Sequence, residues 1–124
     1  MSKSDSTEYF APGLMDHSEL DAAWLKEEIK KEETKYWLAA YAKKHIEEIF
    51  ASSSVTPAEL EKIRNRTLKQ YSDSWNSIES KISPEDKIYY YSTPREYWAS
   101  LAGQDGLAVI RNCKVVYVLI LTQS

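Results

Sequence analysis

The sequence predicts an α+β fold, in which a long N-terminal αα-hairpin packs on a small sheet of about three strands with one short helix between strands. Three observations predict this fold. A helix-start signal at Thr56 opens a long stripe of apolar residues. Residues 87–92 combine an isoleucine with a run of tyrosines, as strands often do. Residues 115–121 form an apolar run of strand length.

Composition is typical of a single globular domain. The chain has 124 residues, of which 43% are hydrophobic and 28% charged, a balance that supports one folded core. Residues 1–17 are expected to be a partly disordered N-terminal arm, and residues 18–124 a single α+β domain. The formal net charge is -3, and basic residues are interspersed with acidic ones, which disfavours nucleic-acid binding.

Cysteine use and apolar run lengths set further bounds. Cys113 is the single cysteine, which excludes an internal disulfide and a cysteine-based metal cluster within one chain. The segment from Met1 to Thr7 is polar and lacks the apolar core of a signal peptide. No apolar run approaches the length of a membrane span. The sequence therefore predicts a cytoplasmic protein with no membrane partner.

The first predicted element is a helix over residues 18–51, which contain neither Gly nor Pro. Ser18 is the expected N-cap, and Leu25 and Ile29 repeat with helical spacing. Two versions remain open: one helix of about thirty residues, or a helix that bends near Glu32–Thr34.

The second predicted helix has the clearest start. Thr56, Pro57 and Glu59 form a capping-box pattern with proline at the first helical position. Apolar residues follow at three- and four-residue spacing from Leu60 to Ile82. This helix is expected to pack antiparallel on the first as an αα-hairpin.

A strand over residues 87–92 and a short helix over residues 94–102 come next. The tetrapeptide Thr93-Pro94-Arg95-Glu96 repeats the Thr-Pro-x-Glu pattern of the second helix and predicts the start of the short one. Gly103 is its expected C-cap. Three of its residues are expected to point inward: Tyr97, Trp98 and Leu101.

The chain is expected to end in a hairpin with Asn112 and Cys113 at its turn. Asn suits the left-handed backbone of such a turn and Cys suits it poorly, so a longer loop is the alternative. With a two-residue turn, Arg111 faces Lys114, Ile110 faces Val115 and Val109 faces Val116. One face then carries Leu107, Val109, Val116, Val118 and Ile120, and the other carries Ala108, Ile110, Val115, Tyr117, Leu119 and Leu121.

A strand over residues 115–121 is apolar on both faces, so both faces need a cover. The long helices can cover one face. The other can be covered by the 94–102 helix with the N-terminal arm, by a homodimer, or by a different protein. A homodimer is favoured, because an uncovered face would exceed the apolar patch that a monomer tolerates.

Aromatic residues supply the candidate site. No catalytic, cofactor-binding or metal-binding pattern is present, neither a Gly-rich phosphate loop nor Gly-x-Ser-x-Gly nor His-Glu-x-x-His. The nine Tyr and four Trp are the most unusual feature, and such side chains are enriched at interfaces and line ligand pockets. The candidate interface or pocket residues are Tyr89, Tyr91, Tyr97, Trp98, Tyr117, Trp37 and Tyr41.

The last third of the chain combines several features in order: a predicted strand, Ser92-Thr93-Pro94, a Trp98-x-x-Leu-x-Gly103 helix end, and a final hairpin with Gly106 and Arg111. This pattern resembles the C-terminal tail of small uncharacterised bacterial proteins. The turn at Asn112-Cys113 departs from theirs, which contains a glycine. The resemblance implies a bacterial protein but neither an activity nor a site.

These features together favour a non-enzymatic domain that binds another protein or itself through an aromatic and apolar surface. An immunity- or antitoxin-like inhibitor is the more specific expectation, since an acidic protein suits a basic nuclease toxin. The alternative is a small-molecule-binding domain or enzyme with a Tyr- and Trp-lined pocket between sheet and helices.

Overall fold

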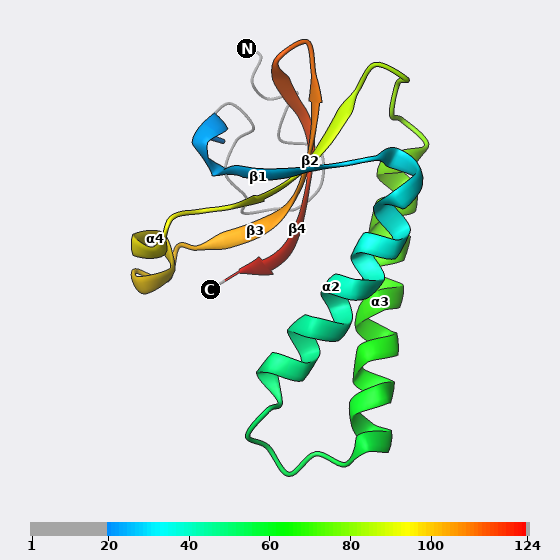
Figure 1. Ribbon diagram of the computed structural model, residues 1–124, viewed down its shortest axis with the longest axis vertical. Helices are drawn as coiled ribbons and strands as arrows, with labels where there is room; N and C mark the ends of the chain where they lie inside the picture. The colour runs from blue at the N-terminus through cyan, green and yellow to red at the C-terminus, as the bar shows by residue number, and fades with distance from the viewer. Residues whose placement is uncertain (1–19, 124) are drawn as a thin grey trace. The chain divides into compact units, whose positions relative to one another are not determined.

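The computed structural model describes residues 20–123 and has an α+β fold (Figure 1). The described chain forms two compact units. The sheet unit comprises residues 20–31 and 81–123, and the helical unit comprises residues 32–80. The predicted N-terminal arm and the N-cap expected at Ser18 lie outside the described residues. The prediction of a single domain, with the helical pair packed on the sheet, stays a prediction.

The sheet is antiparallel and has four strands in chain order, one more than predicted (Figure 1). The predicted strand at residues 87–92 and the terminal hairpin are confirmed. The additional strand lies at the start of the described chain. The strands are β1 (Leu25–Ile29), β2 (Lys87–Ser92), β3 (Gln104–Arg111) and β4 (Lys114–Gln123).

The helix predicted over residues 18–51 is wrong in its first half. Asp21 caps a single 3-10 turn, Ala22–Trp24 (η2), and the chain then extends as β1. Leu25 and Ile29 do repeat at helical spacing, but in the sheet Leu25 pairs with Tyr91 and Ile29 with Ile88. A bulge between them puts the two side chains on opposite faces of the sheet, which disguises the strand period. Pairing with β2 thus overrides a strong local helix propensity.

The terminal hairpin turns at Asn112 and Cys113, as predicted for the shorter loop. Both residues have a left-handed backbone, with φ of 52° and 65°. Two of the predicted pairs, Arg111 with Lys114 and Ile110 with Val115, are also confirmed. The third is wrong: Val109 pairs with Tyr117, because Val116 is an extra residue in β4.

The bulge at Val116 changes which β4 residues share a face. Beyond it, Val118 and Ile120 lie on the face of Ala108 and Ile110, whereas Tyr117 and Leu119 lie with Leu107, opposite to the prediction. We call the two faces the Tyr91 face and the Leu107 face. The Tyr91 face carries Leu25, Tyr89, Tyr91, Ala108, Ile110, Val115, Val118 and Ile120; the Leu107 face carries Ile29, Ile88, Tyr90, Leu107, Val109, Tyr117 and Leu119.

Burial is greatest on β3 rather than on β4. On β3, Leu107 and Val109 are buried on one face and Ala108 on the other, so both faces of this strand are covered. On the Tyr91 face the buried cluster consists of Trp24, Tyr91, Ala108 and Val118. In β4, which lies at the edge of the sheet, most apolar side chains are half-buried. The strand predicted to need cover on both faces is therefore less enclosed than its neighbour.

The helical unit contains α2 (Thr34–Ile49) and α3 (Pro57–Glu79), which pack antiparallel (Figure 1). An ion pair joins Lys35 near the start of α2 to Glu79 at the end of α3, in agreement with the antiparallel direction. The capping box at Thr56 is confirmed. Among the residues that the structure describes, no helix is long and apolar enough to cross a membrane.

Candidate functional site

The seven aromatic residues predicted to form a site do not lie together. Trp37 and Tyr41 belong to the helical unit, and the other five belong to the sheet unit. Within each unit they have different environments, which range from the fully buried Tyr91 to Tyr97 with 38% of its surface exposed. Each group is therefore described by its own contacts.

In the helical unit, the predicted pair extends into a row along α2. The Trp37 and Tyr41 rings stack with centroids 5.4 Å apart, and the His45 ring stacks on Tyr41 at 5.7 Å. Tyr71 of α3 meets Tyr41 at 6.0 Å. All four side chains are half-buried, as expected for aromatic residues at the border of a helix pair.

Tyr91 has a structural role in the sheet unit. Its side chain is fully buried, and its hydroxyl accepts a hydrogen bond from Gln104 Nε2 at 3.1 Å. Burial and the nearby Asp105 charge raise the pKa of Tyr91 above its usual range. The neutral phenol thus serves as a satisfied core group and does not face solvent. The assignment of Tyr91 to an interface or pocket stays a prediction.

On the opposite face of the sheet from Tyr91, the Leu107 face, Tyr90 and Asp105 form a polar pair. The Tyr90 hydroxyl donates to Asp105 Oδ2 at 2.6 Å, and the Asp105 side chain is buried. Burial, together with this hydrogen bond, raises the pKa of Tyr90. Neither residue was predicted as a site residue. The pair satisfies a buried carboxylate, which is costly to bury without such a donor.

The short helix α4 (Arg95–Ala99) is held by contacts at both of its ends. Before it, the Trp98 indole N–H donates to the Thr93 carbonyl at 3.1 Å. After it, Gly103 lies directly against the Trp98 ring, since a Cβ at Gly103 would come within 2.3 Å of that ring. Gly103 is therefore needed for close approach, and its predicted role as C-cap is wrong.

Ser100 is the C-cap of α4, and Leu101 follows it at the left-handed C′ position. The Leu101 backbone is left-handed with φ of 63°, and the adjacent Ala102 N–H donates to the Tyr97 carbonyl at 2.7 Å. The Leu101 side chain is 78% exposed, so the prediction that it points inward is wrong. A non-glycine residue in this conformation costs about 1 kcal/mol.

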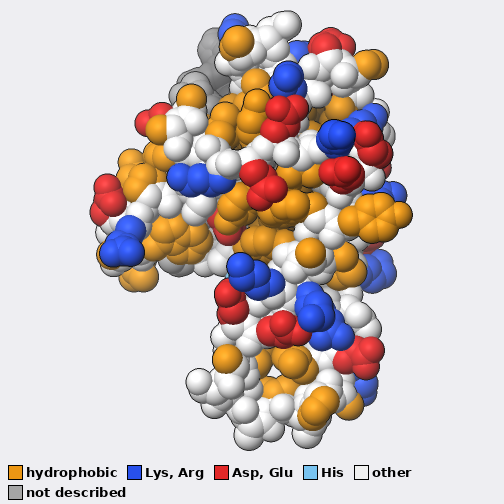
Figure 2. Space-filling view, in the orientation of Figure 1, with side chains coloured by type: hydrophobic (Ala, Val, Ile, Leu, Met, Phe, Trp, Pro, Cys, Tyr) orange, Lys and Arg blue, Asp and Glu red, His pale blue; other side chains and the backbone are white. Residues whose placement is uncertain are grey.

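Tyr97 is an exposed residue of α4 whose ring packs on the sheet unit. Its ring meets the buried Trp24 ring edge-on, with centroids 5.4 Å apart. Two exposed charged residues, Arg95 and Glu96, precede it on α4. In Figure 2, hydrophobic side chains bordered by acidic and basic ones are visible in the region that Figure 1 labels α4. We call Arg95, Glu96, Tyr97 and Leu101 the α4 surface.

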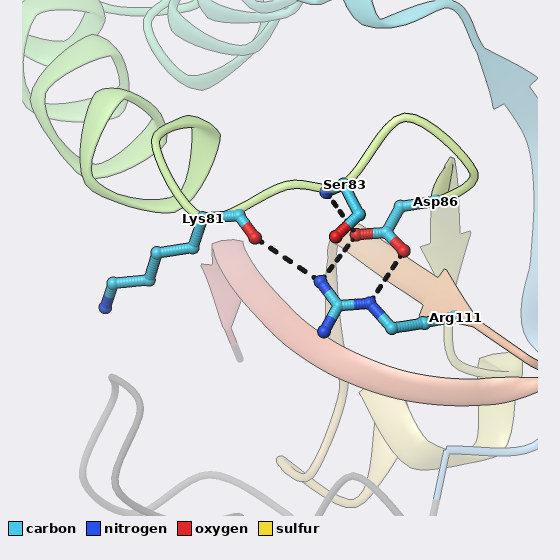
Figure 3. Close-up of polar contacts among 4 residues, drawn as sticks. All are labelled: Lys81, Ser83, Asp86 and Arg111. Carbon is cyan, nitrogen blue, oxygen red and sulfur yellow. Dashed lines mark hydrogen bonds and ion pairs between the residues drawn. The ribbon is translucent and has the colours of Figure 1, made fainter.

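A half-buried ion pair lies near the turn of the terminal hairpin (Figure 3). Arg111 donates from Nε and Nη2 to the two carboxylate oxygens of Asp86, each at 2.8 Å, and Nη2 also reaches the Lys81 carbonyl at 3.3 Å. The Ser83 N–H donates to the same carboxylate at 2.8 Å. These bonds hold the pKa of Asp86 below its usual range. The arrangement fixes the loop before β2 to the end of β3.

Tyr117 and Tyr89 lie on opposite faces of the sheet. On the Leu107 face, the Lys81 ammonium lies 5.9 Å from the centre of the Tyr117 ring, which is a cation–π distance. On the Tyr91 face, Tyr89 lines a cavity of about 250 Å³. Its other described lining residues are Leu20, Asp21, Ala22, Leu25, Ile110, Cys113 and Val115.

Comparison with protein-family models, with curated proteins and with solved structures finds no match. The bacterial origin suggested by the resemblance of the last third of the chain stays a prediction. Within residues 20–123, no group of three or more His, Cys, Asp or Glu side chains is placed to hold a metal ion.

The sequence predicted Tyr97 as an interface candidate but did not predict that Leu101 would be exposed. The apolar Leu101 at helical spacing predicts a buried residue, and Gly103 two positions later is a plausible C-cap. One signal was present: a glycine next to a tryptophan-bearing turn can be required for ring packing, which leaves an earlier residue to end the helix.

Proposed function

We propose that this protein is a non-enzymatic protein-binding domain and that the α4 surface contacts the partner. The observation that carries the proposal is Leu101, an apolar side chain that is 78% exposed on a left-handed backbone. A single exposed leucine is ordinary on a protein surface. An exposed leucine on a left-handed backbone is less ordinary, because the stability of the fold alone would favour glycine at that position.

Tyr97 supports the same surface. Its ring is held by Trp24, so little side-chain entropy is lost when a partner covers it. Tyrosine is also among the residues that contribute most to binding energy at protein interfaces. Arg95 and Glu96 are exposed on the same short helix and add charges of both signs to this surface, as found at the polar rim of an interface.

The stability of the isolated protein tests the central observation. Leu101→Gly removes the left-handed strain, so the free energy of unfolding is expected to rise by about 1 kcal/mol, measured by urea denaturation. Tyr36→Ala is the matched control, because Tyr36 is also 78% exposed but lies on α2. A loss of stability in Leu101→Gly would mean that Leu101 serves the fold, and would remove the argument for binding.

The immunity- or antitoxin-like version of this proposal is supported by the net charge of -3. Its test is titration calorimetry of the purified protein with the toxin domain encoded beside it. Binding is expected, with a dissociation constant raised at least about tenfold by Leu101→Gly or Tyr97→Ala and unchanged by Tyr36→Ala. Absence of binding removes this version. Binding that both α4 variants leave intact would remove the α4 surface as its site.

A small-molecule-binding domain is the second candidate, and the cavity on the Tyr91 face supports it. The volume of about 250 Å³ lies just below the range of roughly 300–1,000 Å³ for ligand pockets. Its described lining is mostly apolar, with the Tyr89 phenol and the Asp21 carboxylate as polar groups. A metabolite that raises the melting temperature of the wild type but not of Ala22→Trp, which fills the cavity, would favour this function.

A further inference from the structure

The two edge strands of the sheet differ in length and charge. β1 has five residues, and its central Lys26, Glu27 and Glu28 are all exposed. β4 has ten residues, and its segment Val115–Ile120 contains no charged side chain. Charged residues on a short edge strand are a common protection against pairing with another strand. β1 has this protection, and the Val115–Ile120 segment of β4 lacks it.

The outer side of β4 is open over the same segment. Within residues 20–123, β4 pairs with β3 alone, so the outward backbone groups of Val115–Ile120 have no partner strand in the described chain. The side chains there are half-buried, except for the buried Val118. A strand placed beside them would satisfy the backbone groups and cover the remaining apolar surface.

We infer that β4 of a second copy of this chain pairs antiparallel with this edge, so that two four-stranded sheets become one. Two identical strands paired about a two-fold axis require facing residues to lie on the same face of the sheet. Val118 opposite Val118 of the copy meets this condition, and it sets Tyr117 opposite Leu119. Every facing pair is then apolar, which no charged or polar partner strand would achieve.

The bulges in β4 are consistent with this register. The extra residues are Val116 and Leu121, so the ladder with β3 is regular from Tyr117 to Ile120. Bulges bend and twist an edge away from further pairing. They therefore centre the pairing near Val118, with the bulged Val116 at its border opposite Ile120 of the copy. This inference concerns a different surface from the α4 surface, and a second copy instead of a different protein.

The solution mass of the full chain, measured by light scattering across micromolar concentrations, tests the inference. The wild type is expected at twice the 14.3 kDa of one chain. Val116→Lys places a charge opposite the copy's apolar Ile120 and is expected to raise the dissociation constant at least about tenfold. The cost to the monomer is small, because Val116 is half-buried and faces no β3 residue. Glu28→Lys, which also introduces a lysine on an edge strand but on β1, is the control and should leave the mass unchanged.

A disulfide test makes the register specific and does not depend on how Val116→Lys folds. In a Cys113→Ser background, Val118→Cys is expected to form an intermolecular disulfide under mild oxidation, because facing Cβ atoms are close enough. Lys26→Cys on β1, in the same background, is expected to form no intermolecular disulfide. A monomeric wild type at every concentration would overturn the inference. So would a dimer that dissociates in Leu101→Gly but not in Val116→Lys, because it would form through the α4 surface.

Discussion

Two helix starts in this chain share the pattern Thr-Pro-x-Glu and use it differently. At the start of α3, the Thr56 hydroxyl accepts from the Glu59 N–H at 3.2 Å, and the Glu59 carboxylate accepts from the Thr56 N–H at 3.1 Å. At the start of α4, the Thr93 hydroxyl donates to the Gln104 carbonyl at 3.2 Å and accepts from the Gln104 N–H at 3.0 Å. Pro94 becomes the N-cap there, without a side-chain cap.

The difference follows from helix length and burial. α3 has 23 residues and an exposed Thr56, so a local capping box adds to a helix with many internal hydrogen bonds. α4 has five residues, too few for a stable isolated helix, and Thr93 is buried. Its conformation depends on contacts with distant residues. Changes at the α4 start should therefore cost more than the same changes at the α3 start.

The largest effect is expected from Gly103→Ala. The new Cβ would lie 2.3 Å from the Trp98 ring, and the ring cannot move aside easily because its indole N–H is bonded to Thr93. Overpacking of this kind costs about 3 kcal/mol, measured as the loss in the free energy of unfolding by urea denaturation.

A double variant separates ring packing from backbone effects at Gly103. In Trp98→Leu, the smaller side chain leaves room for the Cβ, so adding Gly103→Ala should cost much less than it does in the wild type. Equal costs in both backgrounds would show that Gly103 is required for its backbone, as the sequence-based assignment to a C-cap implied.

The next effect compares the two threonines directly. Thr93→Val keeps the shape of the side chain but removes the acceptor of the buried Gln104 N–H, and should cost about 2 kcal/mol. Thr56→Val removes an exposed cap and should cost about 1 kcal/mol. Urea denaturation measures the loss in the free energy of unfolding for each variant. Thr→Ser at each site is the control that keeps the hydroxyl. Equal losses would contradict the distinction between the two starts.

The same contrast explains what the sequence could predict of the fold. Elements whose signals are local were predicted well: the capping box of α3, the bounds of β2, and the turn at Asn112. Elements decided by distant partners were not. The five residues of β1 favour a helix, and the pairing with β2 that makes them a strand involves residues 59 to 66 positions away, from Ile29 with Ile88 to Leu25 with Tyr91.

The candidate site shows the same limit. Aromatic composition drew attention to Tyr97, but the sequence gives no sign of which aromatic residues share a surface, because that depends on which strand or helix carries each of them. Leu101 was predicted to point inward, whereas its left-handed backbone just beyond the end of α4 leaves its side chain exposed. The extra Val116 likewise reversed the faces of β4 with no local sequence signal.

The smallest expected effect is the pH dependence of the α3 start. Hydrogen bonds from the backbone and then the side chain of Thr56 lower the pKa of Glu59 in the folded protein. The unfolded chain then binds this proton more readily, so the stabilisation is present above the unfolded pKa of about 4.3 and is lost as pH falls through the lower folded pKa. In thermal unfolding from pH 7 to pH 3, the wild type should begin more stable than Glu59→Gln, and the gap between their melting temperatures should close. Comparison with Glu59→Gln cancels the titration of every other group, so a gap that stays constant over this range would mean that the ionised Glu59 does not stabilise the cap.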